Sequence, residues 1–129
     1  MTESFDPNEI LYRGLHKMWI EDDNTVSSAA FKDSCGISVD RDGGRNEQEC
    51  IDRLLKALPK LEGVCKLSCG DVSNCDAITV YCPMPDNEFH CEIHDSAEQI
   101  QIKSKAKSRK LASKSQIVYI NEVQTQSAT

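Results

Sequence analysis

The stretch Phe89-His90-Cys91-Glu92-Ile93-His94 alternates apolar and ionisable residues without exception. Such alternation predicts a β-strand that packs one face on a core, because successive side chains of a strand point to opposite sides of the sheet. The apolar face would carry Phe89, Cys91 and Ile93. The other face would carry His90, Glu92 and His94. The stretch therefore predicts a half-buried strand with two imidazoles and a carboxylate in one row.

The segments around this strand predict further short strands and two helices. Asn46 and Glu49 resemble a capping box, and apolar residues follow at helical spacing up to Pro59, which predicts a helix over 47–58. A second, basic helix is expected over about 104–114, held by a narrow apolar stripe. The other expected strands are 10–15, 26–31, 36–40, 64–69, 77–82 and 117–120. We expect 70–74 to be a loop, and 64–69, 77–82 and 88–94 to form a meander.

These elements predict an α+β fold in a single domain over residues 1–120. Its core would be a mostly antiparallel sheet of about five to seven short strands with the two helices. Residues 121–129 are polar, and we expect them to form a flexible tail.

Composition limits the class of protein. The chain has 129 residues, of which 39% are hydrophobic and 28% charged, and a net charge of -6, which is typical of one ordinary globular domain. No apolar run is long enough to cross a membrane and no secretory signal is visible, so we expect a cytoplasmic protein without membrane contact. Its seven cysteines are then expected to be reduced thiols, mostly small hydrophobic core residues.

The polar row of the opening strand offers two kinds of chemistry. Imidazole is the side-chain group that generally exchanges a proton near neutral pH. Glu92 lies between His90 and His94, so the three are candidate catalytic residues for acid-base or metal-assisted chemistry. A sharper alternative is a zinc site of His90, Cys91 and His94 with one further cysteine, which could be Cys82, Cys75, Cys69 or Cys65. However, Cys91 would point away from both histidines, and no two cysteines are separated by two residues. The remaining alternative is the solvated side of a half-buried strand.

A second candidate site precedes the 47–58 helix. Gly43 and Gly44 allow a tight turn with free backbone N–H groups, and Arg41 and Arg45 add guanidinium groups beside the positive end of the helix. This pattern favours an anion-binding site, for which Arg13 at the end of the first strand is a further candidate. A plain strand-turn-helix junction would have the same composition.

Arg13 also belongs to a pattern with Ser27, Ser28 and Glu92. A strand arginine, a serine-containing strand and a later glutamate resemble ADP-ribosyltransferases and related NAD-consuming domains. The resemblance implies that Arg13, Ser27 or Ser28 and Glu92 would surround a nucleotide, although the usual Ser-Thr-Ser run is missing.

The segment Lys103–Lys114 is strongly basic, and residues 101–129 hold six basic side chains but one acidic side chain. Clustered amines bind phosphates or acidic proteins, since they release counterions on binding. The segment therefore predicts either a contact with a nucleic acid or a partner protein, or an exposed helix face.

The chain also resembles small bacterial proteins that share its Leu-Tyr-Arg-Gly, Ser-Ser-Ala-Ala-Phe-Lys-Asp, Ser-Val-Asp-Arg-Asp-Gly-Gly and His-x-Glu-Ile-His segments. That resemblance does not define an activity, and it leaves the cofactor unknown. From the residues we expect a domain that binds or processes a phosphate-containing ligand, such as a nucleotide or a nucleic-acid end. The alternative is a non-catalytic protein-interaction module with an acidic body and a basic helix.

Overall fold

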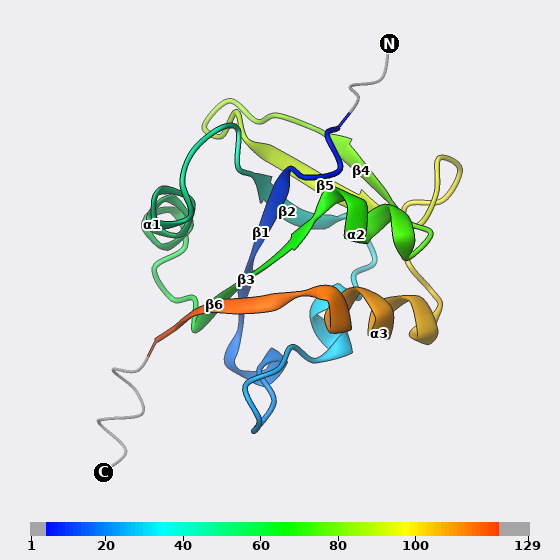
Figure 1. Ribbon diagram of the computed structural model, residues 1–129, viewed down its shortest axis with the longest axis horizontal. Coiled ribbons are helices and arrows are strands. Elements are labelled where there is room, and N and C mark those ends of the chain that lie inside the picture. The colour runs from blue at the N-terminus through cyan, green and yellow to red at the C-terminus, as the bar shows by residue number, and fades with distance from the viewer. Residues whose placement is uncertain (1–4, 122–129) are drawn as a thin grey trace.

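A computed structural model of the chain describes residues 5–121 as one antiparallel six-stranded sheet with helices on both faces (Figure 1). The strands are β1 (Ile10–Leu15), β2 (Ile37–Arg41), β3 (Gly63–Ser68), β4 (Ile78–Tyr81), β5 (His90–His94) and β6 (Gln116–Ile120). The α-helices are α1 (Glu47–Ala57), α2 (Cys69–Asn74) and α3 (Lys105–Lys114). Two short 3-10 helices, η1 (Lys17–Trp19) and η2 (Ser28–Phe31), connect β1 to β2. The predicted α+β class is confirmed. Residues 122–129 of the expected tail lie outside the described residues.

The sheet order is β4-β5-β2-β1-β3-β6, so the first strand lies inside the sheet. Chain neighbours β4 and β5 pair as a hairpin, whereas β3 pairs with β1 and β6. The expected meander of 64–69, 77–82 and 88–94 is therefore wrong for its first member. Hydrophobic patterns define which segments are strands, but they carry no information about which strands pair.

The strand register decides which side chains share a face. Tyr12 lies opposite Asp40, and Asp40 opposite His90, so these three side chains form a row across β1, β2 and β5 on one face. The other face carries fully buried residues such as Leu11, Cys91 and Ile93. The opening stretch thus has its apolar side in the core.

The two faces are covered unequally. The apolar face, including Leu11 and Ile93, packs with α2, α3 and η2 into the larger core. The opposite face packs on α1 through a smaller cluster in which Tyr12 and Val64 contact Cys50, Ile51 and Leu54. Figure 1 shows α1 on one side of β1 and α2 with α3 on the other. The described residues of this smaller cluster come from β1, β3, β6, α1 and the turn after α1. The polar side chains of β5 therefore do not belong to the cluster.

Two helices, α1 and α2, begin with a capping box, and the sequence predicted the first of them. Asn46 and Glu49 form the predicted capping box at α1, with the Glu49 N–H donating to Asn46 Oδ1 at 2.9 Å. Ser68 and Asp71 form a second box that starts α2 where we expected a loop. The helix α2 has only two buried residues, Cys69 and Val72. Two apolar residues do not form a pattern that distinguishes a short helix from a loop.

The expected strand over 26–31 is also wrong. Ser27 caps η2 by accepting a hydrogen bond from the Ala29 N–H at 3.2 Å, and Ala30 and Phe31 are fully buried. The serine side chain favours a turn over a ladder, because it satisfies a backbone donor locally.

Candidate functional site

A groove of about 670 Å³ lies where α1 leaves the sheet uncovered. Its floor includes the row Tyr12, Asp40 and His90, together with Ser38. One wall comes from α1 and the turn after it, through Arg53, Leu54, Ala57, Leu58 and Pro59. The other wall comes from Met84, Asp86 and Asn87, and His16 and Trp19 also line it. We call this hollow the α1 groove; its volume is typical of small-molecule sites.

Hydrogen bonds hold the second wall of the α1 groove against its floor. The Asn87 side chain donates to the buried Asp40 carboxylate at 2.9 Å. Arg53 donates from Nε to Asn87 Oδ1 at 3.3 Å and from Nη2 to the Asp86 carbonyl at 2.6 Å. Since α1, β2 and the turn are joined in this way, the groove is formed before any ligand arrives.

His90 is the residue of the predicted catalytic trio that lines the α1 groove. Its Nδ1 lies 3.0 Å from the Cys82 carbonyl oxygen and 3.5 Å from Cys82 Sγ. Glu92 and His94 form a pair of their own, with Oε1 and Nε2 at 2.8 Å. The trio shares one strand face, yet the structure gives its members different neighbours.

Cys82 follows β4 and is half-buried beside His90. Burial, with a smaller effect of the Glu92 carboxylate, raises the pKa of the Cys82 thiol to about 11. Its thiol is therefore protonated at neutral pH in the metal-free protein. Cys82 is one of the four cysteines expected as alternative zinc ligands beside the histidines, and the register of the β4–β5 hairpin places it next to His90.

Arg13 extends to the end of the α1 groove, where β1 and β2 separate beyond Tyr12. The residue is 6% exposed, and its guanidinium donates from Nε to the Ala30 carbonyl at 2.6 Å and from Nη1 to the Ser38 carbonyl at 2.7 Å. It also lies 5.1 Å from the centre of the Trp19 ring. Burial lowers the pKa of Arg13 from its ordinary value. These contacts give Arg13 a structural role between β1, β2 and η2.

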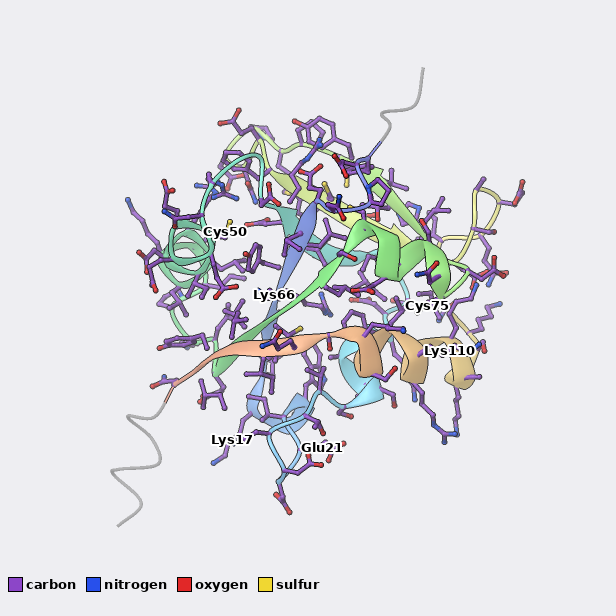
Figure 2. The ribbon with its side chains drawn as sticks, in the orientation of Figure 1. Lys17, Glu21, Cys50, Lys66, Cys75 and Lys110 are labelled. Carbon is purple, nitrogen blue, oxygen red and sulfur yellow. The ribbon has the colours of Figure 1, made fainter. Side chains whose placement is uncertain are left out.

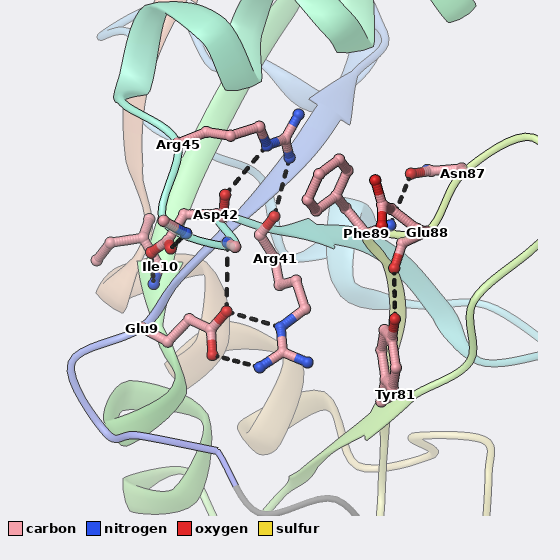
Figure 3. A network of polar contacts seen from close by, with 11 residues as sticks. Glu9, Ile10, Arg41, Asp42, Arg45, Tyr81, Asn87, Glu88 and Phe89 are labelled. Atoms are coloured by element: carbon pink, nitrogen blue, oxygen red, sulfur yellow. Dashed lines mark hydrogen bonds and ion pairs between the residues drawn. The ribbon is translucent and has the colours of Figure 1, made fainter.

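The predicted anion site at Gly43, Gly44, Arg41 and Arg45 is occupied by groups of the chain itself (Figure 3). Gly43 N–H faces Glu9 Oε2 at 3.4 Å, and Gly44 N–H donates to Asp42 Oδ1 at 2.8 Å. Arg41 pairs with Glu9 through two contacts of 2.7 and 2.8 Å. Both glycines have positive φ, 56° and 83°, as their turn requires.

Arg45 stacks on Phe89, with its guanidinium carbon 3.6 Å from the ring centre. It also donates from Nε to the Asp42 carbonyl and from Nη2 to the Arg41 carbonyl, each at 3.0 Å (Figure 3). Neither Arg41 nor Arg45 lines the α1 groove. The structure therefore places the glycine turn beside Phe89 but apart from the groove that contains His90.

Ser27 and Ser28 line a different hollow, of about 750 Å³, together with Arg109 and residues of the 24–26 segment. Arg13 and Glu92 are not among its lining residues. The three elements of the resemblance to ADP-ribosyltransferases are thus not gathered around one described hollow.

The basic run is partly used inside the fold. Ser108, Leu111 and Ala112 of α3 are buried, and the Ser108 hydroxyl donates to the Phe31 carbonyl at 2.9 Å. Lys107 pairs with Asp95 at 2.8 Å. The other basic side chains of the run are exposed, namely Lys103, Lys105, Arg109, Lys110 and Lys114. A contact of this face with a partner protein or a nucleic acid stays a prediction.

The cysteines are distributed through both cores. Figure 2 shows Cys50 beside α1 and Cys75 on the side of α2 and α3. All seven are free thiols, and Cys35 alone among them is exposed. Burial raises the pKa of Cys65 and Cys91 to about 12 and that of Cys69 to about 11.

We expect one rapidly reacting thiol when the native protein meets an aromatic disulfide reagent at neutral pH. It should be Cys35, because a reactive thiol needs solvent access, whereas the others are shielded and Cys82 remains protonated. The Cys35→Ser variant should lose the fast phase, and Cys82→Ser should keep it. A fast phase of two or more thiols in the wild-type protein would contradict this expectation.

Several groove residues carry weak signals in the sequence. Asp40 ends the expected strand 36–40, Asn87 lies in a polar, turn-like segment, and Trp19 is a single aromatic residue without a surrounding pattern. In the sequence, Arg53 looks like an ordinary arginine on the exposed face of a helix. Cys82 had a partial signal, since a turn limited to 83–87 would place it opposite Glu88, whereas the structure pairs it with His90 across the longer connection 83–89.

Comparison with models of protein families, with curated proteins and with solved structures found no match. No α-helix within residues 5–121 has the length and apolar character needed to cross a membrane. The proposals below therefore rest on the geometry of the described residues.

Proposed function

We propose that this chain binds a small organic molecule in the α1 groove, with His90 as the group available for proton transfer. The observation that carries the proposal is the groove itself, a hollow of about 670 Å³ with an apolar wall and polar groups on its floor. Concave, largely preformed hollows with a few convergent polar groups are where small ligands bind.

The lining favours a ligand of low net charge that has an aromatic or apolar body. Leu54, Ala57, Leu58 and Met84 supply apolar surface, and Trp19 supplies an aromatic ring. The charged lining residues balance, because Arg13, Arg53 and Lys60 stand against Asp33, Asp40 and Asp86. Arg13 and Arg53 already donate to groups of the chain. A phosphate-containing ligand, expected from the sequence, remains one class to be tested against neutral compounds.

Trp19 makes this proposal measurable, since it is the single tryptophan of the chain and it lines the groove. We expect a ligand found in a panel of nucleotides and neutral aromatic compounds to change Trp19 fluorescence and to raise the melting temperature. Ala57→Phe, which places a ring in the groove wall, should weaken binding of that ligand at least tenfold.

Lys56→Phe is the matched control, because Lys56 is exposed on the same helix and does not line the groove. A ligand that binds both variants equally well would place the binding site elsewhere. If no compound of either class binds the wild-type protein, the proposal is also contradicted.

A further inference from the structure

Three side chains of different metal-binding chemistry meet at the β4–β5 hairpin. Cys82 follows β4, and its backbone N–H donates to the His90 carbonyl at 3.2 Å, so it lies opposite His90. Glu92 is two residues further along β5 on the same face. The possible ligand atoms of Cys82, His90 and Glu92 all lie within 4.8 Å of one another. We call these three residues the Cys82 cluster.

The distances are close to those of a zinc site. Zinc binds sulfur at about 2.3 Å and nitrogen at about 2.0–2.1 Å, so two such ligands in a tetrahedron lie about 3.5 Å apart. Cys82 Sγ and His90 Nδ1 are already 3.5 Å apart. The other separations are at most 4.8 Å, so they reach the tetrahedral value when the atoms approach by no more than about 1.3 Å, a movement that rotation of the Glu92 side chain can supply.

The surroundings of Glu92 hold its carboxylate at this place. His94 Nε2 lies 2.8 Å from Glu92 Oε1, so an imidazole supports the carboxylate. Gly36 leaves the space that the carboxylate occupies, since a Cβ atom there would overlap Glu92 Oε1 and lie 2.8 Å from His94 Nε2. Groups that orient a ligand in this way are typical of metal sites, where their loss weakens binding.

We propose that Cys82, His90 and Glu92 bind a divalent transition-metal ion of the zinc type. A thiolate and an imidazole select such ions over Mg²⁺ and Ca²⁺, which prefer oxygen ligands. Three protein ligands leave a fourth position for water or another molecule. Since Nδ1 of His90 faces Cys82, binding there replaces its contact with the Cys82 carbonyl and leaves the ring proton on Nε2.

The metal site does not depend on a ligand in the α1 groove, although His90 belongs to both. The Cys82 cluster lies on one hairpin, whereas the groove needs α1 and Trp19 as well. Ala57→Phe should therefore bind the metal ion like the wild-type protein. Failure of one proposal leaves the other to its own test.

The test is a titration of the full chain, without a histidine tag and in reducing buffer, with Co²⁺ and then with Zn²⁺ in competition with a chromophoric chelator. We expect one ion per chain, a near-ultraviolet charge-transfer band of a cobalt–thiolate bond, and displacement of Co²⁺ by Zn²⁺. An excess of Mg²⁺ or Ca²⁺ should not compete. The ion should raise the melting temperature, and a chelator should reverse the change.

Conservative variants assign the ligands. Cys82→Ser should abolish the cobalt–thiolate band, and His90→Ala should weaken binding at least a hundredfold. His94→Ala and Gly36→Ala keep all three ligand residues but disturb the position of the Glu92 carboxylate, so they should weaken binding about tenfold, as for other groups that orient a ligand. Circular dichroism of each variant checks that it keeps the wild-type fold. Glu92→Gln has the shape of the wild-type side chain but no negative charge, so it tests the carboxylate ligand with the least disturbance of the fold.

Cys35→Ser is the matched control, because Cys35 is the exposed thiol and is not part of the cluster. It should leave the stoichiometry and the charge-transfer band unchanged. Absence of the band in the wild-type protein would overturn the proposal. Its persistence in Cys82→Ser, or its loss in Cys35→Ser, would do the same.

Discussion

Replacing Arg13 by methionine is expected to lower the free energy of unfolding by about 3 kcal/mol. The guanidinium is buried and donates to the Ala30 and Ser38 carbonyls at 2.6 and 2.7 Å. Methionine keeps most of the aliphatic stem but removes the donor from the Ala30 carbonyl, which is buried, and from the Ser38 carbonyl, which is part-buried. An unsatisfied buried acceptor costs about 1–3 kcal/mol, and the part-buried acceptor should cost less. The measurement is urea denaturation at equilibrium, with the slope compared between variants.

Arg109→Met is the control for loss of an arginine as such, because Arg109 is exposed on α3. It should change stability by less than about 0.5 kcal/mol. Arg13→Lys should recover only part of the loss, since an ammonium group does not have the fork that reaches two carbonyls. A loss below about 1 kcal/mol for Arg13→Met would show that the two hydrogen bonds contribute little to the fold.

Phe31→Ala is expected to destabilise the protein by about 3–5 kcal/mol, the cost of truncating a fully buried phenylalanine. Phe31 is 0% exposed and belongs to the larger core, and its carbonyl accepts the hydrogen bond from the Ser108 hydroxyl of α3. The substitution should therefore leave a cavity between η2, α3 and the sheet. Equilibrium denaturation by urea gives the loss of stability directly.

Met18→Ala provides the contrast, because Met18 is 82% exposed on η1. Its effect should lie within about 0.5 kcal/mol of zero. Phe31→Leu, which fills most of the space, should cost about 1.5 kcal/mol or less. If Phe31→Ala and Met18→Ala had similar effects, η2 would not form part of the cooperative core.

The sequence predicts elements well where a periodic pattern and a terminal signal agree. Asn46, Glu49 and Pro59 mark both ends of α1, and the alternation of 89–94 marks β5. The sequence fails where a segment is short, as in α2, or where local capping competes with strand propensity, as at Ser27. Pairing of β1 with β3 could not be predicted, because it depends on contacts between distant segments.

The same division holds for the candidate site. His90 was predicted from residue type and alternation, and the structure places it in the α1 groove. The glycine turn was predicted as an anion site, but Glu9, from another segment, supplies a carboxylate there. Composition gives no information on whether a donor is free or already bound within the fold. That property is decided by tertiary contacts alone.

The two proposed sites differ in how strongly binding depends on the folded state of the whole chain, because one of them lies within the β4–β5 hairpin. Cys82, His90 and Glu92 lie within one short segment, so bringing them together closes a short loop and costs little chain entropy. An unfolded chain would then retain some affinity for a metal ion, which reduces the stabilisation that the ion gives the native state. The α1 groove combines residues from Tyr12 to His90 and does not exist without the sheet. A groove ligand would therefore report on global folding, whereas a metal ion would report chiefly on one hairpin.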